Sequence, residues 1–113
     1  MGSHAAVAAV FLQDRKLVDA VIRDHHSAPI SPKEKALFDY VSAANASRGV
    51  IDRKVVEQAR AAGWPDGALY DAATVVALFN FYNRWIDATG VHDMPAAAYG
   101  MSGERMAARG YDF

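Results

Sequence analysis

The sequence predicts an all-α protein, and three observations carry that prediction. Apolar residues recur at three- and four-residue intervals, which is the spacing of a helix with one buried face. Glycine and proline divide the chain into segments of helical length, and no segment alternates polar and apolar residues as a strand does. Of the 113 residues, 52% are apolar and 22% charged, as in ordinary globular domains. We expect one helical domain over residues 1–93 and a C-terminal tail over 94–113.

The first two helices are expected over residues 4–13 and 15–24. The earlier segment is rich in alanine, the residue with the highest helix propensity. The later one carries an amphipathic stripe, and a break is expected near Asp14 between the two. Residues 25–30 are read as a loop, because Pro29 disfavours helix in the residue before it.

The start of the third helix is the clearest local signal in the sequence. Ser31 can cap the helix, Pro32 suits its first position, and Glu34 can complete a capping box. The helix should end between residues 45 and 49.

Two more helices follow. Asp52 is a plausible N-cap for the fourth helix, and Gly63 stands where a left-handed glycine would end it. We expect Asp66 to cap the last long helix, over residues 67–89, with Gly90 as its stop. Beyond residue 94 we expect an extended tail with one helical turn near residues 104–109, and its aromatic residues are candidates to pack on a neighbour.

The long helix has almost no polar face, especially from Val75 to Trp85. A helix that is apolar all round must be covered on most sides, and a domain this small can hardly surround it. The sequence therefore predicts a homo-oligomer formed through this helix. The amide of Asn80 should hydrogen-bond across a helix interface, because buried amides need partners. A pocket for an apolar ligand, lined by the aromatic residues of this helix, is the alternative.

Composition excludes several classes of function. With no cysteine, the chain has no disulfide, thiolate metal site or cysteine nucleophile. A net charge of −1, with acids and bases interleaved, predicts no nucleic-acid binding. No apolar run reaches the ~18 residues of a membrane span, and no basic segment precedes the short apolar run near the start. We therefore expect no membrane association and a cytoplasmic location.

The histidines offer little chemistry by themselves. Asp24, His25 and His26 resemble part of a metal site, but adjacent histidines rarely reach one ion, and zinc needs three or four ligands. We therefore predict no metal and no cofactor. Glycine-rich phosphate loops and nucleophile-elbow motifs are also missing from the sequence.

Three segments together resemble a known family. They are residues 36–40 (Ala-Leu-Phe-Asp-Tyr), the helix over 55–63 ending in Ala-Ala-Gly, and residues 71–84, which end in Phe-Asn-Phe-Tyr-Asn-Arg. This arrangement is similar to the peroxidase-related group of the alkylhydroperoxidase D-like proteins, in the carboxymuconolactone decarboxylase superfamily. The resemblance covers residues 4–91. It implies an oligomeric, antiparallel helical bundle and an antioxidant hydroperoxide reductase (peroxidase).

The same resemblance places the active site at the start of the chain. Members carry Cys-X-X-Cys-X-X-X-His at a helix start, with a glutamate upstream in the proton relay. Aligning the helices puts His4 on the motif histidine, so the second cysteine would fall immediately before Met1. We therefore expect this chain to be inactive as a peroxidase. Met-Gly-Ser-His also matches a cloning remnant, which leaves His4 with a second explanation.

Three readings of function remain open from the sequence. The first is a cysteine-less member of the peroxidase-related group. The second is a non-enzymatic module for helical oligomerisation or for binding a small apolar ligand. The third is cofactor-free catalysis by His4, of the decarboxylase type found in the superfamily.

Overall fold

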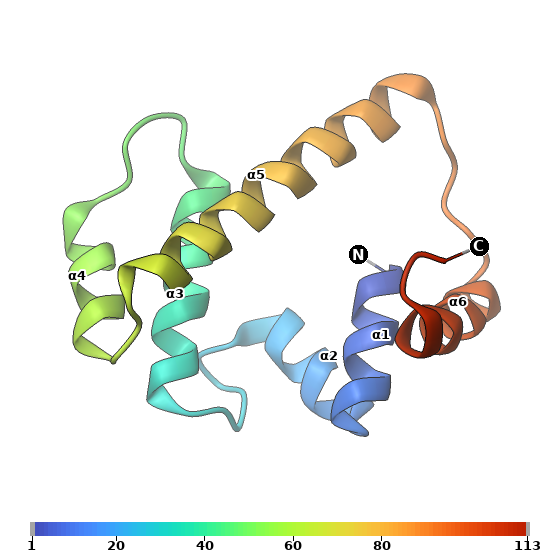
Figure 1. Ribbon diagram of the computed structural model, residues 1–113, viewed down its shortest axis with the longest axis horizontal. Helices are drawn as coiled ribbons and strands as arrows, with labels where there is room; N and C mark the ends of the chain where they lie inside the picture. Colours follow the sequence, from blue (N-terminus) through green and yellow to red (C-terminus); the bar gives the residue numbers. More distant parts are fainter. Residues whose placement is uncertain (1, 113) are drawn as a thin grey trace. The chain divides into compact units, whose positions relative to one another are not determined.

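The computed structural model describes residues 2–112, and over these residues the protein is all-α, with six helices and no strand. The all-α prediction is confirmed. The helices form two compact units (Figure 1). One unit combines the residues up to Pro29 with those from His92 onward, and the other spans Ile30–Val91. The expected organisation as a domain over 1–93 with a tail over 94–113 stays a prediction.

The first unit contains α1 (Gly2–Leu12), α2 (Arg15–Asp24) and α6 (Ala96–Arg109). The break near Asp14 is confirmed. Gln13 takes a positive φ of 51°, and the Asp14 carboxylate accepts a 2.9 Å hydrogen bond from the backbone N–H of Leu17. The N–H groups in the first turn of a helix have no intrahelical acceptor, and the Asp14 side chain supplies an acceptor for one of them in α2.

Helix α6 corrects an expectation. The segment predicted as an extended tail with one turn near residues 104–109 is instead helical over Ala96–Arg109. Gly100 and Gly103 both lie within this helix, and Gly103 lies where α6 meets α1. A Cβ at this position would lie 2.5 Å from the Cβ of Ala6, so only glycine allows the two helices to approach this closely.

The second unit contains α3 (Pro32–Ala46), α4 (Arg53–Ala61) and α5 (Asp66–Thr89). The capping box that begins α3 is confirmed: the Ser31 hydroxyl accepts from the Glu34 N–H, and the Glu34 carboxylate accepts from the Ser31 N–H. Gly63 ends α4 with φ +102°, and Gly90 ends α5 with φ +71°. Both predicted glycine stops are therefore confirmed.

The start of α5 differs from the prediction. Pro65 is the N-cap and supplies no side-chain hydrogen bond, whereas Asp66 is the first helical residue. The Asp66 carboxylate instead accepts a 2.6 Å bond from Nε of Arg60 on α4. Pro65 already holds an extended conformation (φ −73°, ψ 156°), which directs the chain into the helix.

A small core holds the second unit together. Tyr40 of α3, Ala59 of α4 and Leu69 of α5 are buried against one another. Trp64, between α4 and α5, donates from Nε1 to the carbonyl of Lys33 at 2.8 Å, and the Lys33 ammonium lies 4.6 Å from the centre of the Trp64 ring. These contacts fix the α4–α5 connection to the start of α3.

Within residues 2–112, the structure has no helix both long enough and apolar enough to cross a membrane.

Candidate functional site

His4 is the one catalytic residue that the sequence suggests, and it lies exposed in the first turn of α1. Its Nε2 atom lies 2.7 Å from the hydroxyl of Tyr111, which follows α6. The two rings are tilted by 44°, with centroids 6.5 Å apart. No sequence pattern predicts this pair, beyond the expectation that aromatic residues of the C-terminal segment pack on a neighbour.

The pair formed by His4 and Tyr111 can support proton exchange. An imidazole and a phenol joined by a hydrogen bond can pass a proton, because each group is both donor and acceptor. Reduction of a hydroperoxide also needs two electrons, which a cysteine pair supplies by becoming a disulfide. This sequence contains no cysteine, so it offers no thiol electron source at His4.

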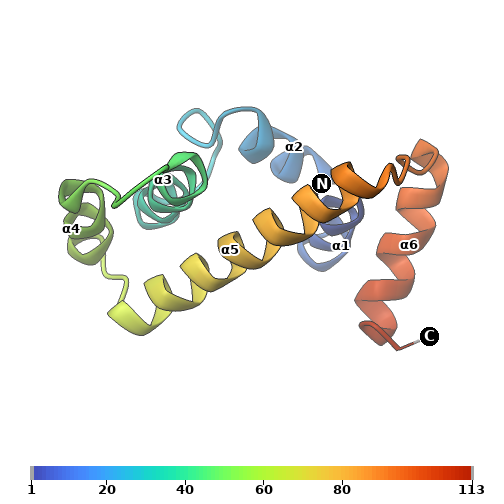
Figure 2. The same ribbon diagram turned by 90° about the horizontal axis from the view of Figure 1, so that it is seen from above.

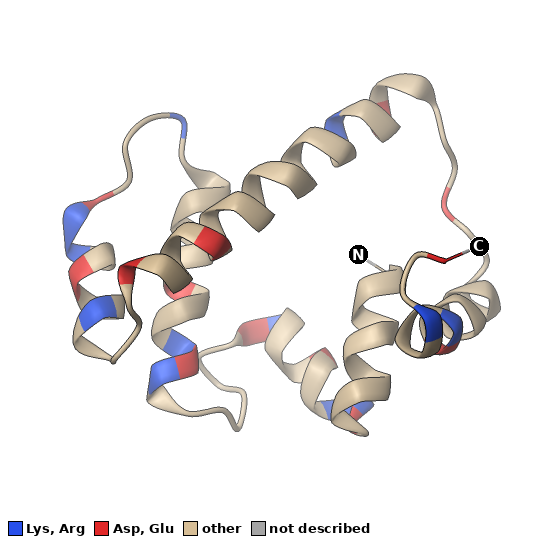
Figure 3. Cartoon of the chain, in the orientation of Figure 1, with Lys and Arg blue, Asp and Glu red and all other residues tan. Residues whose placement is uncertain are grey.

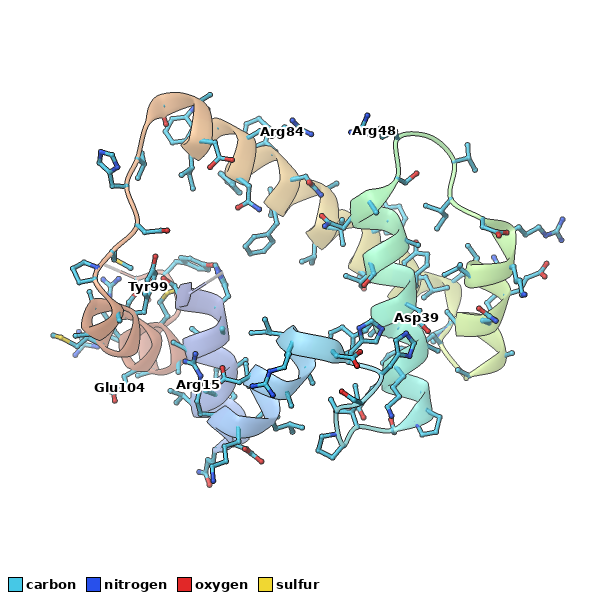
Figure 4. All side chains as sticks on the ribbon, turned by 180° about the vertical axis from the view of Figure 1, so that it is seen from behind. Arg15, Asp39, Arg48, Arg84, Tyr99 and Glu104 are labelled. Atoms are coloured by element: carbon cyan, nitrogen blue, oxygen red, sulfur yellow. The ribbon has the colours of Figure 1, made fainter. Side chains whose placement is uncertain are left out.

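A second aromatic contact lies close to His4 on the same pair of helices. Tyr99 of α6 lies beside the first turn of α1, where its ring is within 2.6 Å of the point that a Cβ on Gly2 would occupy (Figure 4). The Tyr99 hydroxyl donates to Asp93 at 3.0 Å and accepts from the N–H of Met94 at 3.3 Å. The bond to Asp93 raises the pKa of Tyr99. These bonds hold the segment that leads into α6.

The Asp24-His25-His26 trio closes the end of α2. The Asp24 carboxylate accepts a 3.0 Å hydrogen bond from the backbone N–H of His26, and the two imidazole rings lie 4.3 Å apart. Hydrogen bonds from Ser27 and from the His26 N–H lower the pKa of Asp24. Asp24 therefore has a structural role in this turn.

Helix α5 presents the largest group of exposed apolar side chains in the described residues. Between 37% and 63% of each side chain is exposed for seven of its large hydrophobic residues. These are Val75, Leu78, Phe79, Phe81, Tyr82, Trp85 and Ile86.

Most of the apolar stretch of α5 lies in a part of the helix that contains no charged residue. The helix is continuous along its length (Figure 2), and no charged residue lies between Asp71 and Arg84 (Figure 3). A long uncharged surface is unusual on a helix that faces water. Arg84 extends outward from the ribbon of α5 (Figure 4).

The opposite side of α5 faces α3. Ala72, Ala73, Val76 and Asn80 are partly buried there. The Asn80 amide donates to the side-chain oxygen of Asn45 on α3 and to the carbonyl of Val76, both at 3.0 Å. The prediction that Asn80 hydrogen-bonds across a helix interface is confirmed, with an interface inside the chain. Within residues 30–91, the α3 contact thus covers one face of α5, and no other helix of this unit covers the apolar face.

No family model, curated protein or solved structure matches this chain. Two features of the molecule bear on its function and lie in separate units: the pair of His4 with Tyr111, and the exposed apolar face of α5.

Proposed function

We propose that the protein is a homo-oligomeric helical module, built on the scaffold of the peroxidase-related alkylhydroperoxidase D-like proteins but without their thiol chemistry. The apolar face of α5 is the surface through which copies associate. One observation carries this proposal: seven large apolar side chains on one helix are 37–63% exposed.

The area of this face fits a protein interface. Its four aromatic residues, Phe79, Phe81, Tyr82 and Trp85, are 37%, 63%, 48% and 57% exposed. With about 200 Å² for each aromatic side chain, they leave on the order of 400 Å² open to water. The three aliphatic residues extend the patch beyond what a monomer usually exposes. A stable interface buries about 800 Å² per partner, and the aromatic residues alone supply roughly half of that.

The chemistry at His4 supports a non-enzymatic role. The family resemblance implies a peroxidase that depends on a cysteine pair, and this sequence has none. His4 can exchange a proton with Tyr111, but the sequence supplies no thiol as an electron source for this relay. The expected cytoplasmic location and the expected lack of nucleic-acid binding remain predictions that accompany this proposal.

Sedimentation velocity at micromolar concentration tests the association. We expect the unmodified protein to sediment as an oligomer, and Val75→Asp to shift it to monomer. Placing a carboxylate in each copy of an apolar interface should weaken association at least ~100-fold, equivalent to about 3 kcal/mol. A stable monomer for the unmodified protein would overturn the proposal.

Val50→Asp is the matched control. Val50 is fully exposed in the loop between α3 and α4, so this variant makes the same chemical change away from α5. It should sediment like the unmodified protein, and both variants should keep the helical circular dichroism spectrum. Equal effects of the two substitutions would show that α5 has no special part in association.

Turnover of an organic hydroperoxide with a dithiol reductant tests the lack of thiol chemistry. We expect no rate above the uncatalysed reaction. Measurable turnover would refute the non-enzymatic proposal, and its loss in His4→Ala would then assign the activity to the His4–Tyr111 pair. Binding of a small apolar dye by a monomeric protein, lost in Val75→Asp, would favour a ligand-binding module instead.

A further inference from the structure

Six of the exposed residues of α5 follow a seven-residue repeat. These six positions are separated by alternating steps of four and three residues, which is the spacing of the core positions in a coiled coil. We call this set the seam: Asp71, Val75, Leu78, Tyr82, Trp85 and Thr89. All six are exposed, and the four central apolar side chains are 48–57% exposed.

Three further exposed apolar residues of α5 flank this seam, whereas Tyr70, which is 74% exposed, lies outside it. Phe79 and Ile86 follow the core positions on one side, and Phe81 lies on the other. The partly buried residues that pack toward α3, among them Val76 and Asn80, occupy the opposite positions of the repeat. The seam and its flanks therefore form one continuous face that no other helix of residues 30–91 covers.

We propose that the occupant of the seam is α5 of a second copy, running antiparallel in one defined register. This inference rests on the proposed self-association and adds its geometry. In this register Asp71 faces the partner's Thr89, Val75 faces the partner's Trp85, and Leu78 faces the partner's Tyr82. A two-fold axis repeats each pair, so every seam residue has a facing residue.

Charge favours the antiparallel direction. In a parallel pair each seam residue faces its own copy, so the two Asp71 carboxylates would meet in the interface, where like charges repel. In the antiparallel pair they lie at opposite ends of the seam, eighteen residues apart along the helix, or about 27 Å. That separation exceeds the ~8 Å screening length at physiological salt, so the repulsion is lost.

Side-chain volume favours the same direction. In a parallel pair, the two Trp85 side chains would face each other, and so would the two Val75 side chains. The tryptophan pair would be crowded, and the valine pair would leave a void. The antiparallel register combines large with small residues, Val75 with the partner's Trp85 and Leu78 with the partner's Tyr82. Layers of similar volume pack without voids or strain.

The other antiparallel registers lose contacts. If one helix slides by seven residues in one direction, Val75 faces the partner's Leu78, but Trp85 then faces only the partner's Ala68, a small and partly buried residue. Sliding it the other way would leave Val75 without a facing residue. Only the proposed register pairs all four apolar seam residues and keeps the polar residues at both ends. Gly90 ends the helix directly after Thr89, so the seam and the helix end together.

Disulfide trapping tests this geometry, because the protein has no cysteine of its own. Two variants, Asp71→Cys and Thr89→Cys, are mixed after one is labelled with ¹⁵N, and are then oxidised. Neither substitution removes an apolar side chain from the seam. We expect disulfides between the two variants to exceed those within either variant by at least about tenfold, because only facing cysteines come within bonding range. Val50→Cys, in the exposed loop, gives the background.

Each other outcome overturns the inference. Strong self-coupling of Thr89→Cys, which keeps both Asp71 carboxylates, would show a parallel pair. Coupling no stronger than that of Val50→Cys, in a protein that sediments as an oligomer, would show that copies meet in another register or through another surface. These results leave the proposed self-association standing, whereas a monomeric unmodified protein removes both.

Discussion

The close contact between α1 and α6 predicts that two glycines on one helix respond in opposite ways to the same substitution. A Cβ added to Gly103 would lie 2.5 Å from the Cβ of Ala6 and 2.9 Å from its carbonyl carbon. A Cβ added to Gly100 has no atom within 4 Å. Gly103→Ala and Gly100→Ala are therefore a matched pair that differs only in this contact.

The size of the effect follows from these distances. Non-bonded carbons prefer 3.5–4.0 Å, so Gly103→Ala forces α1 and α6 apart by about 1 Å, and overpacking of this kind costs ~1–3 kcal/mol. Replacing a helical glycine by alanine returns ~1 kcal/mol of helix propensity in both variants. We expect Gly100→Ala to raise the free energy of unfolding by up to ~1 kcal/mol. Gly103→Ala should lower it by about 1 kcal/mol.

Urea and thermal unfolding, followed by circular dichroism at one fixed protein concentration, measure the difference. A separation of about 2 kcal/mol corresponds to roughly 8 °C in Tm for a chain of this size. Ala6→Gly should cost less stability in the Gly103→Ala background than in the unmodified protein, because in that background it also removes the atom nearest to the added methyl group. Equal stabilisation by both glycine substitutions would refute the close α1–α6 contact.

Three further substitutions test the second unit by the same unfolding measurement. Ser31→Ala should lower stability by about 1 kcal/mol by removing the cap. The bonds from Ser31 lower the pKa of Glu34 below its ordinary 4.5, so the part of the stabilisation that involves the Glu34 carboxylate is complete above that pH and is lost as pH falls through the lowered pKa. The loss in Ser31→Ala should therefore be smaller in acid, and an equal loss at neutral and acidic pH would contradict the bond from Ser31 to this carboxylate. Trp64→Phe should cost about 1 kcal/mol by leaving the Lys33 carbonyl without its donor, and a neutral result would argue against this bond. Asn80→Ala should cost a similar amount through the lost bond to α3, and an unchanged Tm would argue against it.

Local signals explain which helices could be predicted. The capping box depends on two residues three positions apart, and the glycine stops depend on one backbone conformation each, so sequence alone predicts them. Gly103 shows the limit of this reasoning. Its effect comes from contact with Ala6, far away in the sequence, and a pattern of local breakers therefore predicts the wrong conformation for α6.

The candidate sites likewise include features that could be predicted from the sequence and features that could not. The uncharged surface of α5 could be predicted, because it follows from residue type and helical period alone. The sequence also predicts that Asn80 needs a hydrogen-bond partner. It does not predict that this partner is Asn45, because no local pattern shows which residues of α5 and α3 come into contact. No pattern in the sequence predicts the pairing of His4 with Tyr111, because this pairing depends on how the segment after α6 reaches α1.

The pairing of α1 with α6 has a consequence for the order of folding. Helices α2 to α5 all separate these two partners along the chain, whereas α3, α4 and α5 are consecutive. During synthesis, residues 30–91 can emerge from the ribosome and gather their core while α1 still lacks its partner. The α1–α6 contact must close a loop that contains the whole other unit, and such long-range closure slows folding. Until α6 is made, Ala6 and the rest of the α1 surface that meets it remain exposed, which is when chaperones would have access to it.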